Sequence, residues 1–136
     1  DLGGRRLGSV MVPAEDVVWI RREATPVEAE ELVVRSGHTR LVVIGADRDD
    51  VLGFVHAKDL LTIPSAARER PLPLGRVRRM LVLPDAMSLD DALLAMQRAR
   101  IHVATVTTTS GATAGIVTLE DVIEALVGDI RDESDR

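Results

Sequence analysis

Two stretches of this 136-residue chain begin alike, with Thr25-Pro26-Val27-Glu28-Ala29 and Ser88-Leu89-Asp90-Asp91-Ala92. Each opens on a hydroxyl residue that suits a helix N-cap, and acidic residues follow in the first turn, where the helix dipole favours them. Apolar and small residues then recur every three or four positions, the period of a helix with one buried face. Ala29 and Ala92 lie 63 positions apart. The sequence therefore predicts two equivalent helices and indicates an internal repeat.

The repeat extends beyond these helices. A β-rich run follows each helix, turn residues follow the run, and a second β-rich run leads to a short helix. Val43 and Val106 keep the offset of 63, whereas Gly53 and Gly115 are 62 apart, so one residue is lost in the second turn. The predicted strands are 17–20, 39–44 and 51–55 in the first half and 80–82, 102–107 and 113–117 in the second, and the predicted short helices are 58–61 and 120–123.

The predicted fold class is α/β (α+β), with two strand–helix–strand–strand–helix (β-α-β-β-α) motifs. A motif of about 50 residues is too small for a comfortable core of its own, so we expect the two to pack sheet against sheet by pseudo-twofold symmetry. The stretch between them is polar and rich in arginine and proline, which is typical of a linker. The expected bounds are a first motif with its lead-in at 1–63, a linker at 64–79, a second motif at 80–130 and an acidic tail at 131–136.

Composition excludes several classes of function. The net charge of −5 argues against nucleic acid as a partner, and the absence of cysteine removes disulfides and thiolate metal sites. No apolar run approaches the roughly 18 residues that a membrane span needs. The chain lacks a Gly-x-Ser-x-Gly elbow, a Walker loop and a kinase signature, so we do not expect an enzyme. It starts and stops in charged sequence without an initiator methionine, which we interpret as a domain from a longer protein.

The second strand–helix junction carries the strongest candidate for chemistry, Gly115-Ile116-Val117-Thr118-Leu119-Glu120-Asp121. A helix N-terminus offers free N–H groups and a positive partial charge, which suit a phosphate. The Thr118 hydroxyl is placed to bond a phosphate oxygen, Asp121 to accept from a ribose diol, and Gly115 to leave room for close approach. A purely structural interpretation remains open, in which Thr118 caps the helix and Asp121 is a favourable first-turn acid.

The duplicated junction makes the chain resemble a tandem pair of cystathionine-β-synthase (CBS) motifs, known as a Bateman module. In that family the Gly-x-x-Thr/Ser-x-x-Asp motif contacts phosphate and ribose of an adenine nucleotide. The resemblance implies that Thr118 binds phosphate and Asp121 binds ribose. The residues that it places along the adenine base are Ile101, His102, Val103 and Ala104.

The first junction matches the motif less well. Asp59 is kept after Gly53, but His56 stands where the hydroxyl residue is expected. Arg40 has the reach for a phosphate, with a solvated or ion-paired arginine as the alternative. The sequence thus indicates a stronger site in the second motif and a weaker one formed by Arg40, His56 and Asp59.

A narrower resemblance is to the CBS pair of CorC/HlyC-type proteins. It rests on Val10-Met11-Val12-Pro13, Ser36-Gly37-His38-Thr39-Arg40, Gly53 to Leu61, Arg100 to Ala104, Gly115 to Glu124, and the tail Val127-Gly128-Asp129-Ile130-Arg131-Asp132-Glu133. Two departures from that pattern are Ala14, where a basic residue is usual, and Thr107-Thr108-Thr109-Ser110-Gly111, where Asp-Glu precedes the glycine.

The CorC/HlyC-type resemblance implies a module on the cytoplasmic side of the plasma membrane, between a transmembrane domain and a small C-terminal domain, in a protein linked to magnesium and cobalt efflux. It also implies a homodimer that binds ATP, ADP or AMP as a regulatory ligand, with or without Mg²⁺. The alternative is a structural homodimerisation module whose ligand sites are vestigial.

The remaining polar groups give weaker signals. The histidines His38, His56 and His102 do not have the spacing of a metal motif, so no metal site is expected. The acids Asp129, Asp132, Glu133 and Asp135 are predicted to form a solvated tail, and the cluster Arg76, Arg78 and Arg79 to be exposed.

Overall fold

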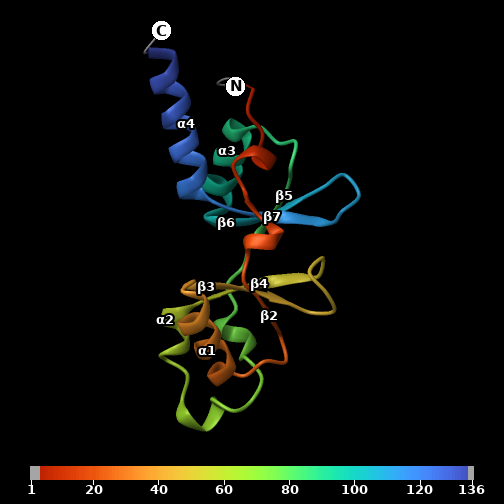
Figure 1. The fold of residues 1–136 in the computed structure, drawn as a ribbon, viewed down its shortest axis with the longest axis vertical. Coiled ribbons are helices and arrows are strands. Elements are labelled where there is room, and N and C mark those ends of the chain that lie inside the picture. Colours follow the sequence, from red (N-terminus) through yellow and green to blue (C-terminus); the bar gives the residue numbers. More distant parts are fainter. Residues whose placement is uncertain (1–3, 135–136) are drawn as a thin grey trace. The chain divides into compact units, whose positions relative to one another are not determined.

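The computed structural model describes residues 4–134, so Asp135 of the predicted tail lies outside the described residues. Within that range the chain forms two compact units. The first-motif unit is Val17–Arg79, and the second-motif unit joins the segment that ends at Asp16 to the chain from Met80 onward. Each unit is a sheet with two helices on it (Figure 1). The predicted mixed α/β fold and the strand–helix–strand–strand–helix order are confirmed.

The first-motif unit is built on a three-stranded sheet in the order β2-β3-β4. β2 runs parallel to β3, and β3 and β4 form an antiparallel hairpin. The elements are β2 (Trp19–Arg21), α1 (Pro26–Ser36), β3 (Arg40–Ile44), β4 (Val51–His56) and α2 (Ala57–Leu60), followed by 3-10 turns at Ser65–Ala67 and Leu74–Arg76. The core holds Leu41, Val43 and Val55, all with no exposed surface.

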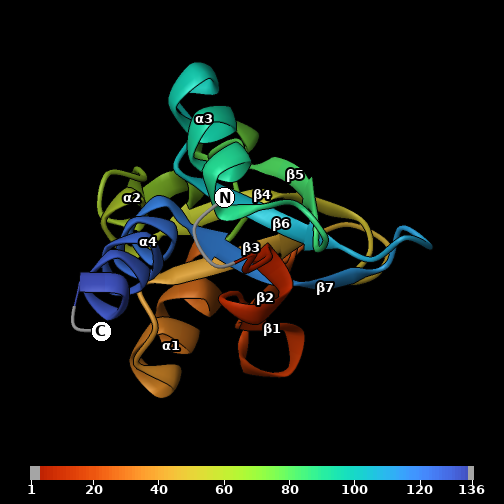
Figure 2. The same cartoon turned by 90° about the horizontal axis from the view of Figure 1, so that it is seen from above.

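The second-motif unit is built on a four-stranded sheet in the order β1-β7-β6-β5, with α3 and α4 over one face (Figure 2). The elements are β1 (Val12–Pro13), β5 (Leu81–Pro84), α3 (Leu89–Ala99), β6 (Val103–Thr107), β7 (Thr113–Thr118) and α4 (Leu119–Ser134), with 3-10 turns at Leu7–Ser9 and Ala14–Asp16. Met96 of α3, Val122 of α4 and Val117 of β7 have no exposed surface and meet in one core.

The first lead-in, residues 4–16, belongs to the second-motif unit, which differs from the expected bound of 1–63. Val12 and Pro13 pair antiparallel with Ile116 and Gly115, and Leu7 is fully buried in the core beside α3 and α4. This pairing covers the edge of β7 that would otherwise present unpaired N–H and C=O groups.

The second lead-in, residues 64–79, was expected to be a linker, but it packs on the first-motif unit. Leu72 is buried in the core of that unit, and Phe54 and Arg78 exchange backbone hydrogen bonds of 3.0 and 2.7 Å. Each motif therefore carries the lead-in of the other. Proline and arginine content signals irregular backbone, but irregular backbone still packs when it carries an apolar side chain such as Leu72.

Helix α4 is longer than the short helix predicted at 120–123, and it includes residues of the predicted tail up to Ser134. The prediction of a short helix assumes that the second motif ends like the first, in which α2 ends at Leu60 and Pro64 comes soon after. No proline follows Pro84 in the sequence, and Val122 and Leu126 give α4 a buried face on which to continue. None of the helices within residues 4–134 has the length and hydropathy that a membrane crossing requires.

The N-terminal caps of α1 and α3 repeat as the sequence predicts, and their C-terminal ends repeat as well. The Thr25 hydroxyl accepts from the Glu28 N–H at 3.2 Å, and the Ser88 hydroxyl accepts from the Asp91 N–H at 3.2 Å. At their C-termini α1 ends on Gly37 (φ +75°) and α3 ends on Arg100 (φ +56°), 63 positions later. Both residues adopt the left-handed conformation, which glycine accepts readily and arginine does not.

We expect Arg100→Gly to raise the free energy of unfolding by about 1 kcal/mol, because it removes the steric cost of a left-handed arginine. Urea unfolding followed by circular dichroism measures the change. Arg98→Gly is the matched control, since it lies inside the last turn of α3 and should lose about 1 kcal/mol of helix propensity. An unchanged or lower midpoint for Arg100→Gly would contradict the assignment of this helix end.

Candidate functional site

Thr118 and Asp121 cap helix α4 reciprocally. The Asp121 N–H donates to the Thr118 hydroxyl at 3.2 Å, and the Thr118 N–H donates to Asp121 Oδ2 at 3.1 Å. The structural interpretation of both residues is thus confirmed. The same bonds leave the Thr118 hydroxyl proton and Asp121 Oδ1 without a protein partner within residues 4–134. One donor and one acceptor therefore remain at the junction for a ligand.

The four residues expected beside a base lie next to this junction. Val103 of β6 is the register partner of Thr118, and the Leu119 N–H donates to the His102 carbonyl at 2.8 Å. Ile101 is half-buried and His102 is exposed, so both present surface to a ligand. Val103 is buried, and the fully buried Ala104 belongs to the hydrophobic core. The predicted residues are brought together, with the side chain of Ala104 on the core side.

Gly115 contacts the chain's own backbone rather than an open slot. A Cβ at this position would collide with the Val12 carbonyl oxygen and would lie 3.0 Å from Met11 Sδ. The missing side chain is what lets β1 pair so closely with β7. The space that the sequence suggested for a ligand beside Gly115 is filled by the first lead-in.

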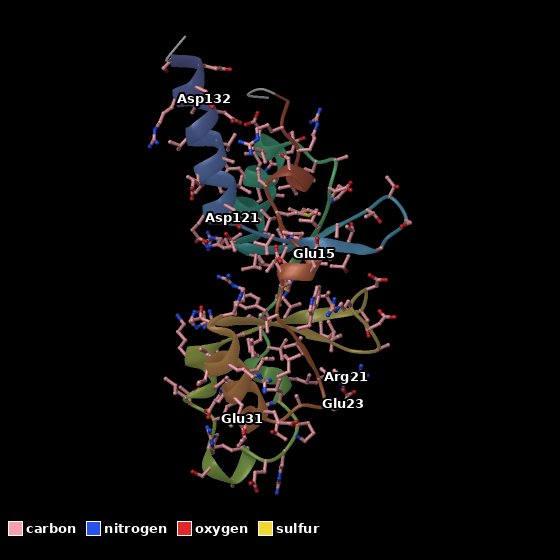
Figure 3. The ribbon with its side chains drawn as sticks, viewed as in Figure 1. Glu15, Arg21, Glu23, Glu31, Asp121 and Asp132 are labelled. Atoms are coloured by element: carbon pink, nitrogen blue, oxygen red, sulfur yellow. The ribbon has the colours of Figure 1, made fainter. Side chains whose placement is uncertain are left out.

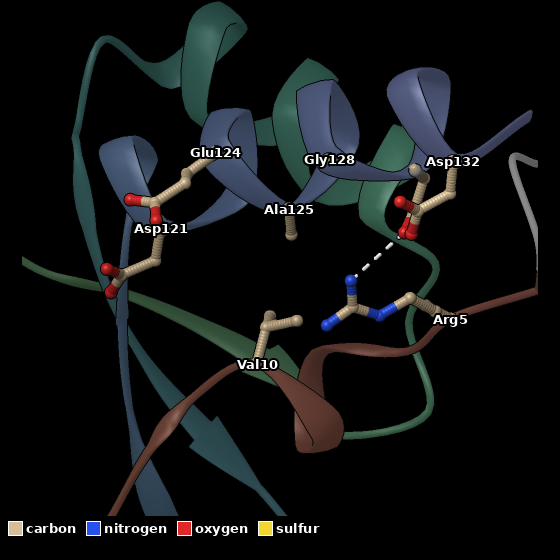
Figure 4. A pocket seen from close by; sticks show the side chains of 8 residues that line it. Arg5, Val10, Asp121, Glu124, Ala125, Gly128 and Asp132 are labelled. Carbon is tan, nitrogen blue, oxygen red and sulfur yellow. Dashed lines mark hydrogen bonds and ion pairs between the residues drawn. The ribbon is translucent and has the colours of Figure 1, made fainter. Parts of the chain in front are cut away.

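A cavity of about 390 Å³ adjoins Asp121 and extends along α4 toward the first lead-in (Figure 4). Figure 3 shows Asp121 at the start of α4 and Asp132 near its end. The lining residues are Arg5, Val10, Asp121, Glu124, Ala125, Gly128, Asp129 and Asp132. The lining residues on α4 recur every three or four positions, so they lie on one face of the helix. A sequence prediction that extended this helix beyond residue 123 would have grouped them. No local sequence pattern marks Arg5 and Val10 as lining residues, because the pairing of β1 with β7 brings them to the cavity.

The cavity is strongly acidic. Arg5 Nη1 donates to Asp129 Oδ1 at 3.0 Å, and Asp129 Oδ2 is buried without a hydrogen-bond partner among residues 4–134. One arginine thus faces four carboxylates. In the part of the chain that the structure describes, no three His, Asp or Glu side chains are placed to hold a metal ion together.

The first junction uses the same geometry with different chemistry. His56 Nδ1 accepts from the Lys58 N–H at 3.1 Å, so the imidazole replaces the hydroxyl as the helix cap. Asp59 Oδ2 accepts from the His56 N–H at 3.0 Å. Arg78 holds both Asp59 oxygens, with Nε at 2.8 Å from Oδ2 and Nη2 at 2.6 Å from Oδ1. Asp59 is therefore engaged at each oxygen. Arg78 is exposed, as predicted, and it is also ion-paired.

Burial, neighbouring charges and hydrogen bonds at this junction shift the pKa values of His56 and Asp59. Burial, reinforced by the positive charge of Lys58, lowers the pKa of His56, although Asp59 acts in the opposite direction. Burial by itself raises the pKa of Asp59, but hydrogen bonds from the Arg78 side chain and the His56 N–H outweigh it and leave the pKa below its usual value. The folded chain thus favours a neutral His56 and an ionised Asp59.

Arg40 lies beside His56. The two are register partners across β3 and β4, and the Arg40 guanidinium carbon lies 5.5 Å from the centroid of the Phe54 ring. Arg40 Nε is buried and has no hydrogen-bond partner in the described range. Stacking on Phe54 holds the guanidinium in place without satisfying this donor.

Two motifs of one topology, each with a capped strand–helix junction, define a tandem α/β module. The sequence profile described as "CBS domain" matches residues 7–65 and 75–128. A structure entitled "Structure of the CBS domain of the bacterial CNNM/CorC family Mg2+ transporter in complex with ATP" superposes with a TM-score of 0.84 at 31% identity, over 93% of this chain and 90% of that one. The chain belongs to the CBS domain family, as a tandem pair of the CorC type.

Curated relatives extend the comparison. A UPF0053 protein of Mycobacterium tuberculosis is 43% identical over 100% of this chain and 32% of its own length. The magnesium and cobalt efflux protein CorC of Escherichia coli is 32% identical over 99% of this chain and 46% of its own length. The chain thus spans less than half of the length of these relatives.

We expect Gly115→Ala to destabilise the second-motif unit by about 1–3 kcal/mol, because the added methyl group forces β1 away from β7. Gly128→Ala is the matched control in the same unit. Its Cβ meets no atom within 4 Å and it gains helix propensity of about 1 kcal/mol. Urea unfolding by circular dichroism compares the two. Equal stability of the Gly115→Ala variant and the unmodified chain would refute the close approach of Val12.

Acidification should weaken the first-motif unit through His56. The unfolded chain takes up a proton near pH 6.5, whereas the folded chain holds the cap neutral to lower pH, so this contribution to stability is present above about pH 6.5 and is lost as the pH falls. Trp19, the single tryptophan of the sequence, lies in this unit and reports its unfolding. The urea midpoint should fall between pH 7.5 and 5, and His56→Thr should reduce that fall while keeping a cap. A variant with the full pH dependence would exclude His56 as its source.

Proposed function

We propose that this chain is a regulatory module that binds an adenine nucleotide at the second motif. The observation that carries the proposal is the pair of unused groups at the β7–α4 junction, the Thr118 hydroxyl proton and Asp121 Oδ1. They match a phosphate oxygen and a ribose hydroxyl in hydrogen-bonding sense. Helix α4 is 16 residues long, so its N-terminus adds favourable potential for a phosphate.

The nucleotide is proposed to bind with Mg²⁺ when it carries more than one phosphate. A polyphosphate chain beside Asp121, Glu124 and the rest of the acidic cavity would meet repulsion, and a divalent cation on the phosphates offsets it. The related CNNM/CorC domain has been solved with ATP, which supports the choice of ligand class. ATP, ADP and AMP share the adenosine that the junction residues would contact.

The module is proposed to be non-catalytic and to act on attached domains. Binding energy can shift a conformational equilibrium only when the ligand prefers one state, so the nucleotide would favour one arrangement of the module. The chain spans about half of the E. coli magnesium and cobalt efflux protein that it resembles, which leaves room for further domains in a parent protein. We place the module on the cytoplasmic side of the plasma membrane, with transmembrane and C-terminal domains in the same parent chain.

A structural homodimerisation module with vestigial ligand sites is the second candidate. It is favoured by an exposed apolar stripe at helical spacing on α4, formed by Ile123, Val127 and Ile130 with 43, 40 and 50% of their surface exposed. A second copy of the chain is the partner that this candidate requires. Dimer formation without nucleotide binding would support it over the regulatory proposal.

Calorimetry tests the regulatory proposal. Titration of ATP, ADP and AMP, each with and without Mg²⁺, should give a dissociation constant below 1 mM for at least one nucleotide, with Mg²⁺ strengthening ATP. Asp121→Asn keeps one oxygen for the cap and removes the second, so binding should weaken about 10- to 100-fold, as expected for a lost hydrogen bond to a charged group.

The control for lost capping is Ser88→Ala. Ser88 caps α3 in the same unit through one hydrogen bond of 3.2 Å, the same length as the Thr118 cap bond. Thr118→Ala should weaken nucleotide binding, and Ser88→Ala should leave it within about twofold. The proposed site would be rejected if no nucleotide bound with a dissociation constant below 1 mM. It would also be rejected if Thr118→Ala and Ser88→Ala weakened nucleotide binding equally.

A further inference from the structure

The two units carry opposite formal charge. The first-motif unit, Val17–Arg79, has eleven basic and nine acidic residues, which give a formal charge of +2. The rest of the chain has six basic and thirteen acidic residues, which give −7. At physiological ionic strength a charge acts over about 8 Å, so the local charge of a surface selects its partner rather than the net charge of the chain. The first-motif unit therefore offers surface to an anionic partner although the chain as a whole is acidic.

The positive charge of this unit comes from the second lead-in, residues 64–79, which is green in Figure 1. Five arginines stand in this segment against one acid, Glu69. The unit itself neutralises two of the five, because Arg68 pairs with Glu30 and Arg78 pairs with Asp59. The remaining arginines keep their charge for another partner.

Arg70 and Arg76 lie on either side of a short turn, Leu74–Arg76. The exposed Arg70 side chain makes no hydrogen bond or ion pair with any residue from 4 to 134. Arg76 donates from Nε to the Thr62 hydroxyl at 3.1 Å and from Nη2 to the Thr62 carbonyl at 3.0 Å, and both of these acceptors are uncharged. Neither arginine is therefore compensated by a carboxylate.

A cavity of about 500 Å³ lies between this lead-in and the residues that follow β2. Its lining residues are Arg22, Glu23, Pro71, Leu72 and Leu74. Leu72 anchors the wall of the cavity, since it is buried and its N–H donates to the Ala24 carbonyl at 2.8 Å. The one carboxylate, Glu23, lies 3.7 Å from the Arg21 guanidinium. The exposed Arg22 thus adds a third positive charge beside the turn.

Leu74 is presented to solvent at the rim of this cavity, with 64% of its surface exposed. An isolated exposed leucine is ordinary on a protein surface. Leu74 differs because its turn is held in place. The Arg76 N–H donates to the Pro73 carbonyl at 2.9 Å, and the Arg76 side chain ties the turn to Thr62. A fixed apolar side chain therefore stands among three arginines.

We propose that Arg22, Arg70, Leu74 and Arg76, which we call the strap patch, bind the surface of an anionic phospholipid bilayer. The guanidinium groups contact headgroup phosphates, and Leu74 enters the boundary between headgroups and acyl chains. A bilayer presents phosphate and hydrocarbon within one side-chain length of each other, which matches an apolar side chain among basic ones. The inference concerns the first-motif unit and does not rest on the proposed nucleotide site.

Vesicle sedimentation tests the proposal on the whole chain. Vesicles of phosphatidylcholine with about one third phosphatidylglycerol should sediment the chain, and pure phosphatidylcholine vesicles should not. An increase in salt from about 50 to about 300 mM should release most of the chain, because screening weakens the attraction. Arg22→Gln and Arg70→Gln should each lower the partition coefficient about fivefold, the usual effect of one basic residue at an anionic surface. Leu74→Ser should lower it about threefold or more, because apolar area is withdrawn from the interface.

Arg35→Gln and Val34→Ser are the matched controls. Both residues are exposed in the last turn of α1, whereas the second lead-in contacts the first turn, where the Val27 N–H donates to the Arg68 carbonyl at 3.3 Å. The rise of the helix between these turns is about 12 Å, more than the screening length. Each control should leave the partition coefficient within about twofold. Equal weakening by Arg35→Gln and Arg70→Gln would show a general charge effect and refute the strap patch.

Three further outcomes decide between a bilayer and other anionic partners. Equal sedimentation by neutral and anionic vesicles would contradict the proposed recognition of headgroup charge. Competition by soluble glycerol phosphate below about 10 mM would show that the patch takes a small anion, and it would refute the bilayer as ligand. A dimer in vesicle-free buffer that Arg70→Gln dissociates would assign the patch to the acidic unit of a second copy, with the same consequence.

The Asp121→Asn variant separates this inference from the proposed function. It removes a group of the proposed nucleotide site and leaves the first-motif unit unchanged, so vesicle binding should stay within about twofold of the unmodified chain. Vesicle binding that persists without any nucleotide binding would support the strap patch alone. Loss of vesicle binding in Asp121→Asn would place the membrane contact in the second-motif unit and overturn the proposal.

Discussion

The close approach of a lead-in to a glycine in the last strand of each motif is the constraint on which the rest of the structure depends. At Gly115 the Val12 carbonyl occupies the place of a side chain, and at Gly53 the Arg78 carbonyl does the same. Gly53 also has φ of +153°, which a residue with a Cβ rarely adopts. Through this approach β1 pairs with the edge of β7, and Arg78 pairs with Phe54 of β4.

The same lead-ins also bring in the residues that make the two junctions chemically different. In the second-motif unit the first lead-in brings Val10 and Arg5 against α4 and closes one side of the acidic cavity. In the first-motif unit the second lead-in brings Arg78 to Asp59. An equivalent aspartate thus keeps a free oxygen in one motif and loses it in the other. The two junctions of the duplicated scaffold therefore differ in the groups that they leave free of protein hydrogen bonds.

Capping and the proposed ligand binding at these junctions call on different atoms of the same side chains. The hydroxyl of Thr118 accepts one N–H and still has its proton to give, whereas the imidazole of His56 uses its only acceptor nitrogen for the cap. A carboxylate has two oxygens, so Asp121 can cap with one and bind with the other. The structural and functional interpretations of the Gly-x-x-Thr-x-x-Asp motif are therefore compatible. A side chain can serve in both only if it has a hydrogen-bond donor or acceptor left after capping the helix.

The sequence alone determined the repeat, the order of strands and helices, and the caps at Thr25 and Ser88, because these follow from periodicity and short-range hydrogen bonding. It also identified His56 as the departure in the first junction. Only the tertiary structure decided which motif each lead-in joins, how far α4 extends, what fills the space beside Gly115 and which partner holds Asp59. Those outcomes depend on contacts between residues far apart in the chain, such as Arg5 with Asp129, and no local pattern records them.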